Sequence, residues 1–150
     1  MILKRVSQPG TFERIRTWIL ESRPPGSRVV LNGRYYALVV DGTQVGAVGV
    51  KRLSWYATEI KHLVVAPEFR RRGHGRTILR LALEKVRTPL VLSTVRADNE
   101  WWLSVNAEEG FSSVSRMETS RGAILLLYTN APHPHVAAGP LTPASSSETE

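Results

Sequence analysis

Apolar side chains recur at helical spacing in three parts of the chain. Residues 11–21 place Phe12, Ile15, Trp18 and Ile19 on one side of a helix. Residues 77–87 repeat the pattern, with apolar positions at 78, 79, 82, 83 and 86. The third segment, residues 100–109, has Asp98 or Asn99 as its capping residue and is followed by a glycine. The pattern predicts three helices.

Runs rich in β-branched and other apolar residues predict six strands, at residues 35–40, 45–50, 56–65, 90–95, 113–119 and 123–129. The first two runs flank Asp41-Gly42, which is a hairpin signal, and the last two flank Arg121-Gly122. The order helix, hairpin, strand, helix, strand, helix, hairpin predicts a mixed sheet with helices packed on it. The strand–helix–strand unit over residues 56–95 should be a right-handed parallel crossover.

The composition changes near residue 131. Residues 131–150 consist largely of Pro, Ala, Ser, Thr and Glu without apolar periodicity. Such a segment buries too little apolar surface to offset its chain entropy, so we expect it to be disordered. The expected organisation is one folded domain over residues 1–130 and a tail over residues 131–150.

Composition restricts the class of protein. No stretch approaches the roughly 20 apolar residues that span a bilayer. The apolar segment in residues 1–5 is too short for the core of a signal peptide. We therefore expect a soluble, cytoplasmic protein without membrane contact. The chain has no cysteine, which excludes thiolate catalysis and disulfides. Two of the four histidines, His133 and His135, lie in the tail, so a metal centre is not expected.

The net charge of +7 comes mainly from arginine. Such a charge suits an anionic partner: nucleic acid, a polyphosphate cofactor or an acidic peptide. A genome that favours arginine codons explains the charge equally well, so charge alone does not select a function.

The residues between the third strand and the second helix stand out as a candidate binding loop. They read Val65-Ala66-Pro67-Glu68-Phe69-Arg70-Arg71-Arg72-Gly73-His74-Gly75-Arg76. A loop at a helix N-terminus directs several free N–H groups and the positive end of the helix dipole to one point. Glycine lets ligand oxygens approach the backbone closely. The physical interpretation is a pyrophosphate-binding loop.

The spacing Val65-x-Pro67-x-x-Arg70-x-x-Gly73-x-Gly75 resembles the acetyl-CoA signature of the GNAT N-acetyltransferase superfamily. A second match lies downstream, where the asparagine at 99, the residue at 106 and Gly110-Phe111 follow the spacing of that family. The resemblance covers roughly residues 35–129. It implies an α/β (α+β mixed) fold: a central mixed, twisted sheet of about six to seven strands flanked by helices, with a V-shaped splay between the central strands.

The resemblance also implies how acetyl-CoA would be bound. The amides of residues 71–76 would bind the pyrophosphate, and the side chains of Arg72 and Arg76 are candidate phosphate partners. Leu63 and Val65 would offer backbone groups to the pantetheine arm and the acetyl carbonyl, with Asn99 across the cleft. The expected cofactor-binding residues are Leu63, Val64, Val65, Arg70, Arg71, Arg72, Gly73, His74, Gly75, Arg76 and Asn99.

Glu59 is the candidate general base, because several members of the family carry a base at the position six residues before Val65. Strand alternation predicts that Glu59, Lys61, Leu63 and Val65 share one face, and that His62 points to the other. A base is needed because an alkyl amine with a pKa near 10 attacks only when neutral. The alternative is a surface glutamate paired with Lys61 or Arg52.

One position departs from the family. Many relatives carry a tyrosine, thought to protonate the leaving thiolate, where this chain has Asn106, and an amide is no acid near neutral pH. Solvent, Ser104 or Tyr56 would then supply the proton.

The predicted function is acetyl transfer from acetyl-CoA to a primary amine (a protein N-terminus, a lysine or a small molecule) by direct attack. The alternatives are a GNAT-like acyltransferase acting on nucleic acid, and a non-catalytic acyl-CoA-binding regulatory module. A homodimer is possible.

Overall fold

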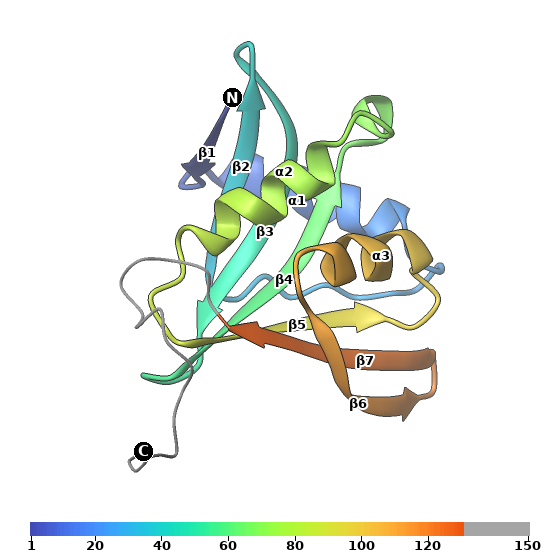
Figure 1. Cartoon of the computed structure of the whole chain (residues 1–150). Helices are drawn as coiled ribbons and strands as arrows, with labels where there is room; N and C mark the ends of the chain where they lie inside the picture. Colours follow the sequence, from blue (N-terminus) through green and yellow to red (C-terminus); the bar gives the residue numbers. More distant parts are fainter. Residues whose placement is uncertain (131–150) are drawn as a thin grey trace.

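The computed structural model describes residues 1–130, which form one seven-stranded sheet with helices on both faces (Figure 1). The strands are β1 (Ile2–Arg5), β2 (Arg34–Val40), β3 (Thr43–Arg52), β4 (Ala57–Val65), β5 (Leu90–Arg96), β6 (Ser112–Thr119) and β7 (Gly122–Asn130). Their order across the sheet is β1-β2-β3-β4-β5-β7-β6. All neighbouring pairs are antiparallel except β4 and β5, so the mixed sheet and the parallel crossover expected from the sequence are confirmed.

Two hydrophobic clusters hold the helices on opposite faces of this sheet (Figure 1). The helix α1 (Pro9–Glu21) buries Ile15 and Trp18 on one face. The helices α2 (His74–Leu83) and α3 (Glu100–Glu108) bury residues such as Ile78 and Val105 on the other. Proline begins α1, where its missing N–H costs nothing. Gly110, with φ +93°, follows α3 in the left-handed conformation that commonly ends a helix.

The strands β4 and β5 separate along their length. Hydrogen-bonded pairing joins them only from Ala57 to Ile60 on β4 and from Leu90 to Ser93 on β5. Beyond Ile60 the two strands diverge, and Figure 1 shows them opening towards α3. This opening is the V-shaped splay expected from the family resemblance, and it leaves the backbone of residues 61–65 unpaired on the side of β5.

A β-bulge interrupts β4 just beyond that point. Ala47 on β3 pairs with Val64 and Gly49 pairs with Lys61, so β4 holds one extra residue opposite Val48. His62 sits at this bulge with φ +52°. A bulge resets which face each later residue occupies.

The bulge corrects the prediction that Glu59, Lys61, Leu63 and Val65 share a face. Leu63 and Val65 belong with the cluster under α2 and α3, whereas Val64 packs with the cluster under α1. Glu59 alternates with Ile60, which faces α2, so Glu59 lies on the α1 face and opposite to Leu63 and Val65. One extra residue therefore separates the candidate base from two of the expected cofactor-facing side chains.

Other boundaries also differ from the sequence prediction. The strand β1 was not expected because it is four residues long and buries only Leu3. The helix α2 begins three residues earlier than predicted, at His74, because the loop turns directly into it. The expected tail, residues 131–150, lies outside the described part of the chain. Within residues 1–130 no helix is long and apolar enough to cross a membrane.

Gly46 on β3 lies against Ile78 of α2 and gives a stability prediction. A Cβ at this position would lie 2.6 Å from the carbonyl oxygen of Val64 and 2.7 Å from Cδ1 of Ile78. We expect Gly46→Ala to lower the free energy of unfolding by about 1–3 kcal/mol, measured by urea denaturation. Gly10→Ala is the matched control because nothing lies within 4 Å of its Cβ position, and it should not lower stability. Equal stability of the two variants would contradict this packing.

Candidate active site

Two cavities meet where β4 and β5 separate. The larger, of about 580 Å³, lies beside the loop before α2 and is called here the loop cavity. The smaller, of about 370 Å³, lies beside the C-terminal end of α1 and is called the α1 cavity. Both are lined by Ser22, Leu63, Val64 and Asn99. A molecule seated in one cavity can therefore reach a molecule seated in the other at the opening between the strands.

The loop cavity is bounded by a row of free backbone donors. Its lining includes, from the loop and α2, Phe69, Arg70, Arg71, Gly73, His74, Gly75 and Arg76. Among the described residues, no backbone or side-chain acceptor is found for the N–H groups of residues 71–76, and α2 has no side-chain cap. Gly73 has φ +80°, a conformation that favours glycine, and this lets the chain turn from the loop into the helix. Free N–H groups at a helix N-terminus suit an anion such as a pyrophosphate.

The arginine side chains of the loop have different partners. The Nε of Arg70 donates to the carbonyl oxygen of Val65 at 3.0 Å, which ties the loop to the end of β4. The Arg72 guanidinium lies over the Phe69 ring, 5.7 Å from its centroid. Arg76 forms an ion pair with Glu108 on α3, and this pair is exposed to solvent. The loop offers a ligand its backbone donors first, and Arg76 would have to leave Glu108 to meet a phosphate.

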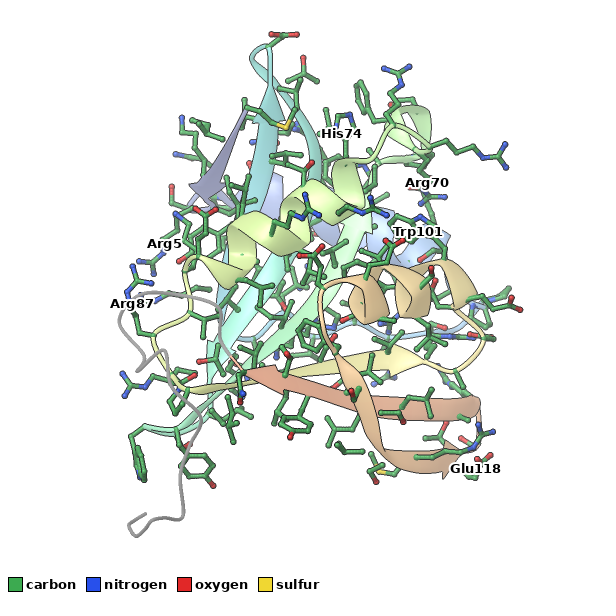
Figure 2. The ribbon with its side chains drawn as sticks, viewed as in Figure 1. Arg5, Arg70, His74, Arg87, Trp101 and Glu118 are labelled. Atoms are coloured by element: carbon green, nitrogen blue, oxygen red, sulfur yellow. The ribbon has the colours of Figure 1, made fainter. Side chains whose placement is uncertain are left out.

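Gly75 has a neighbour that the sequence did not reveal. A Cβ at this position would collide with Cη2 of Trp101 and lie 2.6 Å from its Cζ2, so the indole occupies the space that a side chain would need. Figure 2 shows Arg70, His74 and Trp101 on the same side of the molecule, around the beginning of α2. Trp101 is 55% exposed and lines the loop cavity, whereas Trp102 is buried. Only one of the two adjacent indoles therefore enters the core, because neighbouring helix residues point in different directions.

Asn99 lines both cavities and also caps a helix. Its side-chain oxygen accepts a hydrogen bond of 3.2 Å from the N–H of Trp102 and caps α3. Asn106, further along the same helix, is fully buried and lines neither cavity. Its Nδ2 donates to the carbonyl oxygen of Trp102, and its Oδ1 has no partner. Asn106 is therefore a residue of the core under α3.

The two side chains considered as substitutes for the missing tyrosine lie elsewhere. Tyr56 stands at the start of β4, next to the end that pairs with β5 rather than the end that opens. Ser104 is exposed on α3, and neither residue lines a cavity. The structure thus removes both from the opening between the strands.

The α1 cavity carries most of the titratable groups of the site. Its polar lining consists of Ser22, Arg23, His62, Thr94, Arg96, Asp98 and Asn99. Arg96 and Asp98 form a bidentate pair, with nitrogen–oxygen distances of 3.1 and 2.8 Å. Hydrogen bonding to Arg96 lowers the pKa of Asp98 and raises that of Arg96. No group of three or more His, Asp or Glu side chains that could hold a metal ion occurs in residues 1–130.

Glu59 lies at the edge of the α1 cavity. Its Oε2 accepts a hydrogen bond of 3.0 Å from Oγ1 of Thr94, which lines that cavity. Within residues 1–130 Glu59 forms no ion pair with Lys61 or Arg52, although its charge counteracts the burial that lowers the pKa of Lys61. The structure therefore brings Glu59 next to the α1 cavity through Thr94, on the face that also presents Val64.

His62 lines the α1 cavity, whereas the sequence analysis assigned it to the face opposite Glu59. Its Nδ1 lies 2.6 Å from the hydroxyl oxygen of Tyr35, and the two rings stack with their centroids 6.0 Å apart. Burial lowers the pKa of His62 to about 4, and the positive charges of Arg23 and Lys61 add to this effect. Burial also raises the pKa of Tyr35 to about 12. At neutral pH this pair is uncharged, and the bulge aims the imidazole into the α1 cavity.

The sequence analysis did not identify several polar residues that line the α1 cavity: Ser22, Arg23, His62, Thr94, Arg96 and Asp98. Arg23 begins the stretch Arg23-Pro24-Pro25-Gly26, and the sequence indicated only that a helix ends there. Thr94 and Arg96 face α1 because Val91 and Val95 occupy the other face of β5. A reader of the sequence could have found this alternation, but not the bulge that turns His62 to the same cavity.

Comparisons with known proteins agree with this geometry. The sequence model of the acetyltransferase (GNAT) family matches residues 5–103. A search of curated protein sequences found no significant match.

Many solved structures share the fold. Ard1 from Thermoplasma volcanium is 17% identical, with a TM-score of 0.74, and the match covers 87% of this chain and 97% of that one. The NatC complex bound to Gag peptide and CoA is 16% identical, with a TM-score of 0.71 over 86% and 97% of the two chains. A mutant spermidine N-acetyltransferase, SpeG from Vibrio cholerae, is 15% identical, with a TM-score of 0.72 over 87% and 93%. At these identities the structures show the shared fold.

The contact between Gly75 and Trp101 gives a binding prediction. We expect Gly75→Ala to weaken CoA binding about tenfold in the natural background, because the displaced indole disturbs the loop. In a Trp101→Ala background the same change should have little effect. Calorimetry on the four members of this cycle, with circular dichroism to check folding, measures the coupling. An equal loss in both backgrounds would show that Gly75 serves the approach of the ligand instead.

The His62–Tyr35 pair gives a prediction of pH dependence. The pKa of His62 is about 4 in the folded chain and near 6.5 when unfolded, so the unfolded chain binds more protons between these values. Stability should therefore decrease as the pH falls from 6.5 to 4. His62→Gln should flatten the dependence in this window, measured by urea denaturation at several pH values. An unchanged slope in that variant would contradict the buried, neutral imidazole.

Proposed function

The chain belongs to the acetyltransferase (GNAT) family, and we propose that it transfers an acetyl group from acetyl-CoA to a primary amine by direct attack. The observation that carries this proposal is the meeting of two cavities at the opening between β4 and β5. One cavity has the donors for a pyrophosphate, and the other has titratable groups suited to an amine. Two substrates can thus meet in a shared space lined by Leu63, Val64 and Asn99.

The residues around the loop cavity fit CoA. Six consecutive N–H groups at the start of α2 lack partners and would hold the pyrophosphate, and His74 lies at the first position of that helix. The unpaired backbone of Leu63, Val64 and Val65 along the opening would hold the pantetheine arm. When bound, acetyl-CoA supplies the acetyl group as a thioester. The chain has no cysteine that could carry this group, which supports direct transfer to the amine.

We assign Glu59 as the general base that takes the proton of the amine. Its carboxylate reaches the α1 cavity through Thr94, whose hydroxyl donates to Oε2 and holds it in place. A carboxylate at this position accepts a proton directly or through one water molecule. The bulge in β4 leaves Glu59 on the face of Val64, which lines both cavities.

His62 is a second candidate for the base, because it lines the α1 cavity whereas Glu59 does not. Its imidazole is neutral at pH 7 and can accept a proton when Nδ1 donates to the hydroxyl oxygen of Tyr35, leaving Nε2 with its lone pair. The two candidates lie on the same face of the sheet, so only their separate replacement distinguishes them.

The proton for the leaving thiolate comes from solvent in this proposal. Asn106 is buried, and Ser104 and Tyr56 lie outside both cavities. The loop cavity is open to water, and a thiolate with a pKa near 8.5 leaves without an acid of its own at neutral pH. The missing tyrosine therefore does not by itself favour a non-catalytic acyl-CoA-binding module.

Nucleic acid as the acceptor of the acetyl group is less well supported than a primary amine. In the loop, Arg70 contacts Val65, Arg72 lies over Phe69 and Arg76 pairs with Glu108. On the acceptor side the arginines line the α1 cavity, so they do not form an open basic surface there. The proposed partners are acetyl-CoA and an amine. A homodimer remains a prediction from the sequence.

The experiment follows thiol release from acetyl-CoA with a panel of amines. Glu59→Gln should lower kcat by about 10²–10⁴-fold, the usual contribution of a general base, and leave CoA affinity unchanged. Glu84→Gln is the matched control, because Glu84 is exposed at the end of α2 away from both cavities.

The outcomes separate the candidates. Full activity of Glu59→Gln together with a loss in His62→Gln would transfer the role of base to His62. Full activity of both variants would assign proton removal to solvent. CoA binding by the natural chain without thiol release for any amine would support the non-catalytic module.

A further inference from the structure

Arg23 is a charged residue of the α1 cavity that has no role in the proposed reaction. It follows the last turn of α1, is partly buried and lines the cavity together with Ser22 and Ile19. Among the five ion pairs found in residues 1–130 none includes Arg23. A partly buried guanidinium without a counter-ion is costly, because burial disfavours its charged form.

Other positive groups increase that cost. Arg96 faces the same cavity and repels Arg23 across it; this repulsion and burial together lower the pKa of Arg23, burial being the larger cause. His62 also feels the charge of Arg23, and Lys61 lies beside it on β4. The nearby carboxylates are already engaged: Asp98 binds Arg96, and Glu59 accepts from Thr94. The side chains that line the cavity therefore carry two positive charges, on Arg23 and Arg96, and one negative charge, on Asp98.

We propose that the amine acceptor carries a carboxylate, and that Arg23 binds this carboxylate while the amine faces the opening between β4 and β5. The inference rests on the proposed acetyl transfer and names its acceptor class. A guanidinium binds a carboxylate through two parallel hydrogen bonds, which fixes orientation as well as charge.

The arrangement of the cavity gives this acceptor a direction. Arg23 comes from the end of α1, whereas Leu63, Val64 and Asn99 lie where the cavity joins the loop cavity. A carboxylate bound at Arg23 leaves the rest of the molecule extending past His62 and Thr94 towards that junction. Thr94 holds Glu59 there, so the amine arrives beside the assigned base.

A polycation does not fit the same cavity. Spermidine, the substrate named for one structurally similar enzyme, would bring two or more positive charges next to Arg23 and Arg96. Like charges in a partly desolvated site repel strongly. The acceptor class that balances the charge is an amino acid with a free carboxylate, or a peptide N-terminus followed by an acidic residue.

The test compares the binding of acetylated products to the CoA-saturated protein by calorimetry. N-acetylalanine is paired with N-acetylalaninamide, and acetyl-Ala-Glu-amide with acetyl-Ala-Gln-amide. These probes have no titratable amine, so each pair differs only in the carboxylate, and the two pairs distinguish a free amino acid from a peptide. We expect the acidic member of at least one pair to bind about 10- to 100-fold more tightly.

Variants assign that preference to its residue. Arg23→Gln should remove it, Arg23→Lys should keep part of it, and Arg28→Gln should leave it intact because Arg28 is exposed in the same loop and lines neither cavity. Equal binding within both pairs, or a preference that survives Arg23→Gln, would overturn the inference. A preserved preference without thiol release from the corresponding amines would support the carboxylate site and contradict the proposed transfer.

Discussion

The separation of β4 from β5 is the constraint on which the site depends. Two parallel strands that pair for four residues and then diverge leave the backbone of residues 61–65 unpaired on the side of β5, although β3 still pairs with it on the other side. Buried backbone groups need hydrogen-bond partners, so two strands tend to stay paired. An opening between them persists only where other elements pack against it on both sides. Here α1 closes one side, and α3 with the loop before α2 closes the other. Both cavities exist because this pairing stops.

The bulge at His62 works together with that separation. It adds one residue to β4, so the alternation of side chains between the two faces of the sheet is reversed beyond the bulge. Glu59 and Val64 consequently lie on the face that α1 covers. Leu63 and Val65 lie on the face that α2 and α3 cover. A regular strand would have put Glu59 on the side of the loop cavity. The irregularity instead divides the side chains of the strand between the loop cavity and the α1 cavity.

Electrostatics differ between the two cavities in a way that suits two different molecules. On the loop side the positive character comes from backbone donors at a helix N-terminus, while Arg70 and Arg76 are tied to Val65 and Glu108. On the α1 side it comes from side chains that lie partly buried, and Arg23 lacks a partner among the described residues. Backbone donors recognise a phosphate wherever the loop forms. In the proposed function, the side-chain guanidiniums of the α1 cavity would select the acceptor.

The sequence by itself determined the helices, six of the seven strands and the position of the glycine-containing loop before α2. Helical and alternating periodicity depend on local burial, and the glycines at 73 and 75 lie within a few residues of the helix that they precede, so spacing alone reveals them. The tertiary structure decided the rest, because it depends on neighbours distant in the chain. The pairing of Tyr35 with His62, the indole of Trp101 over Gly75 and the burial of Asn106 join residues from different elements, as do the groups around Arg23. A single extra residue in β4 was enough to reverse the faces assigned by alternation, since a strand has a period of two and its register is set by the partner strand.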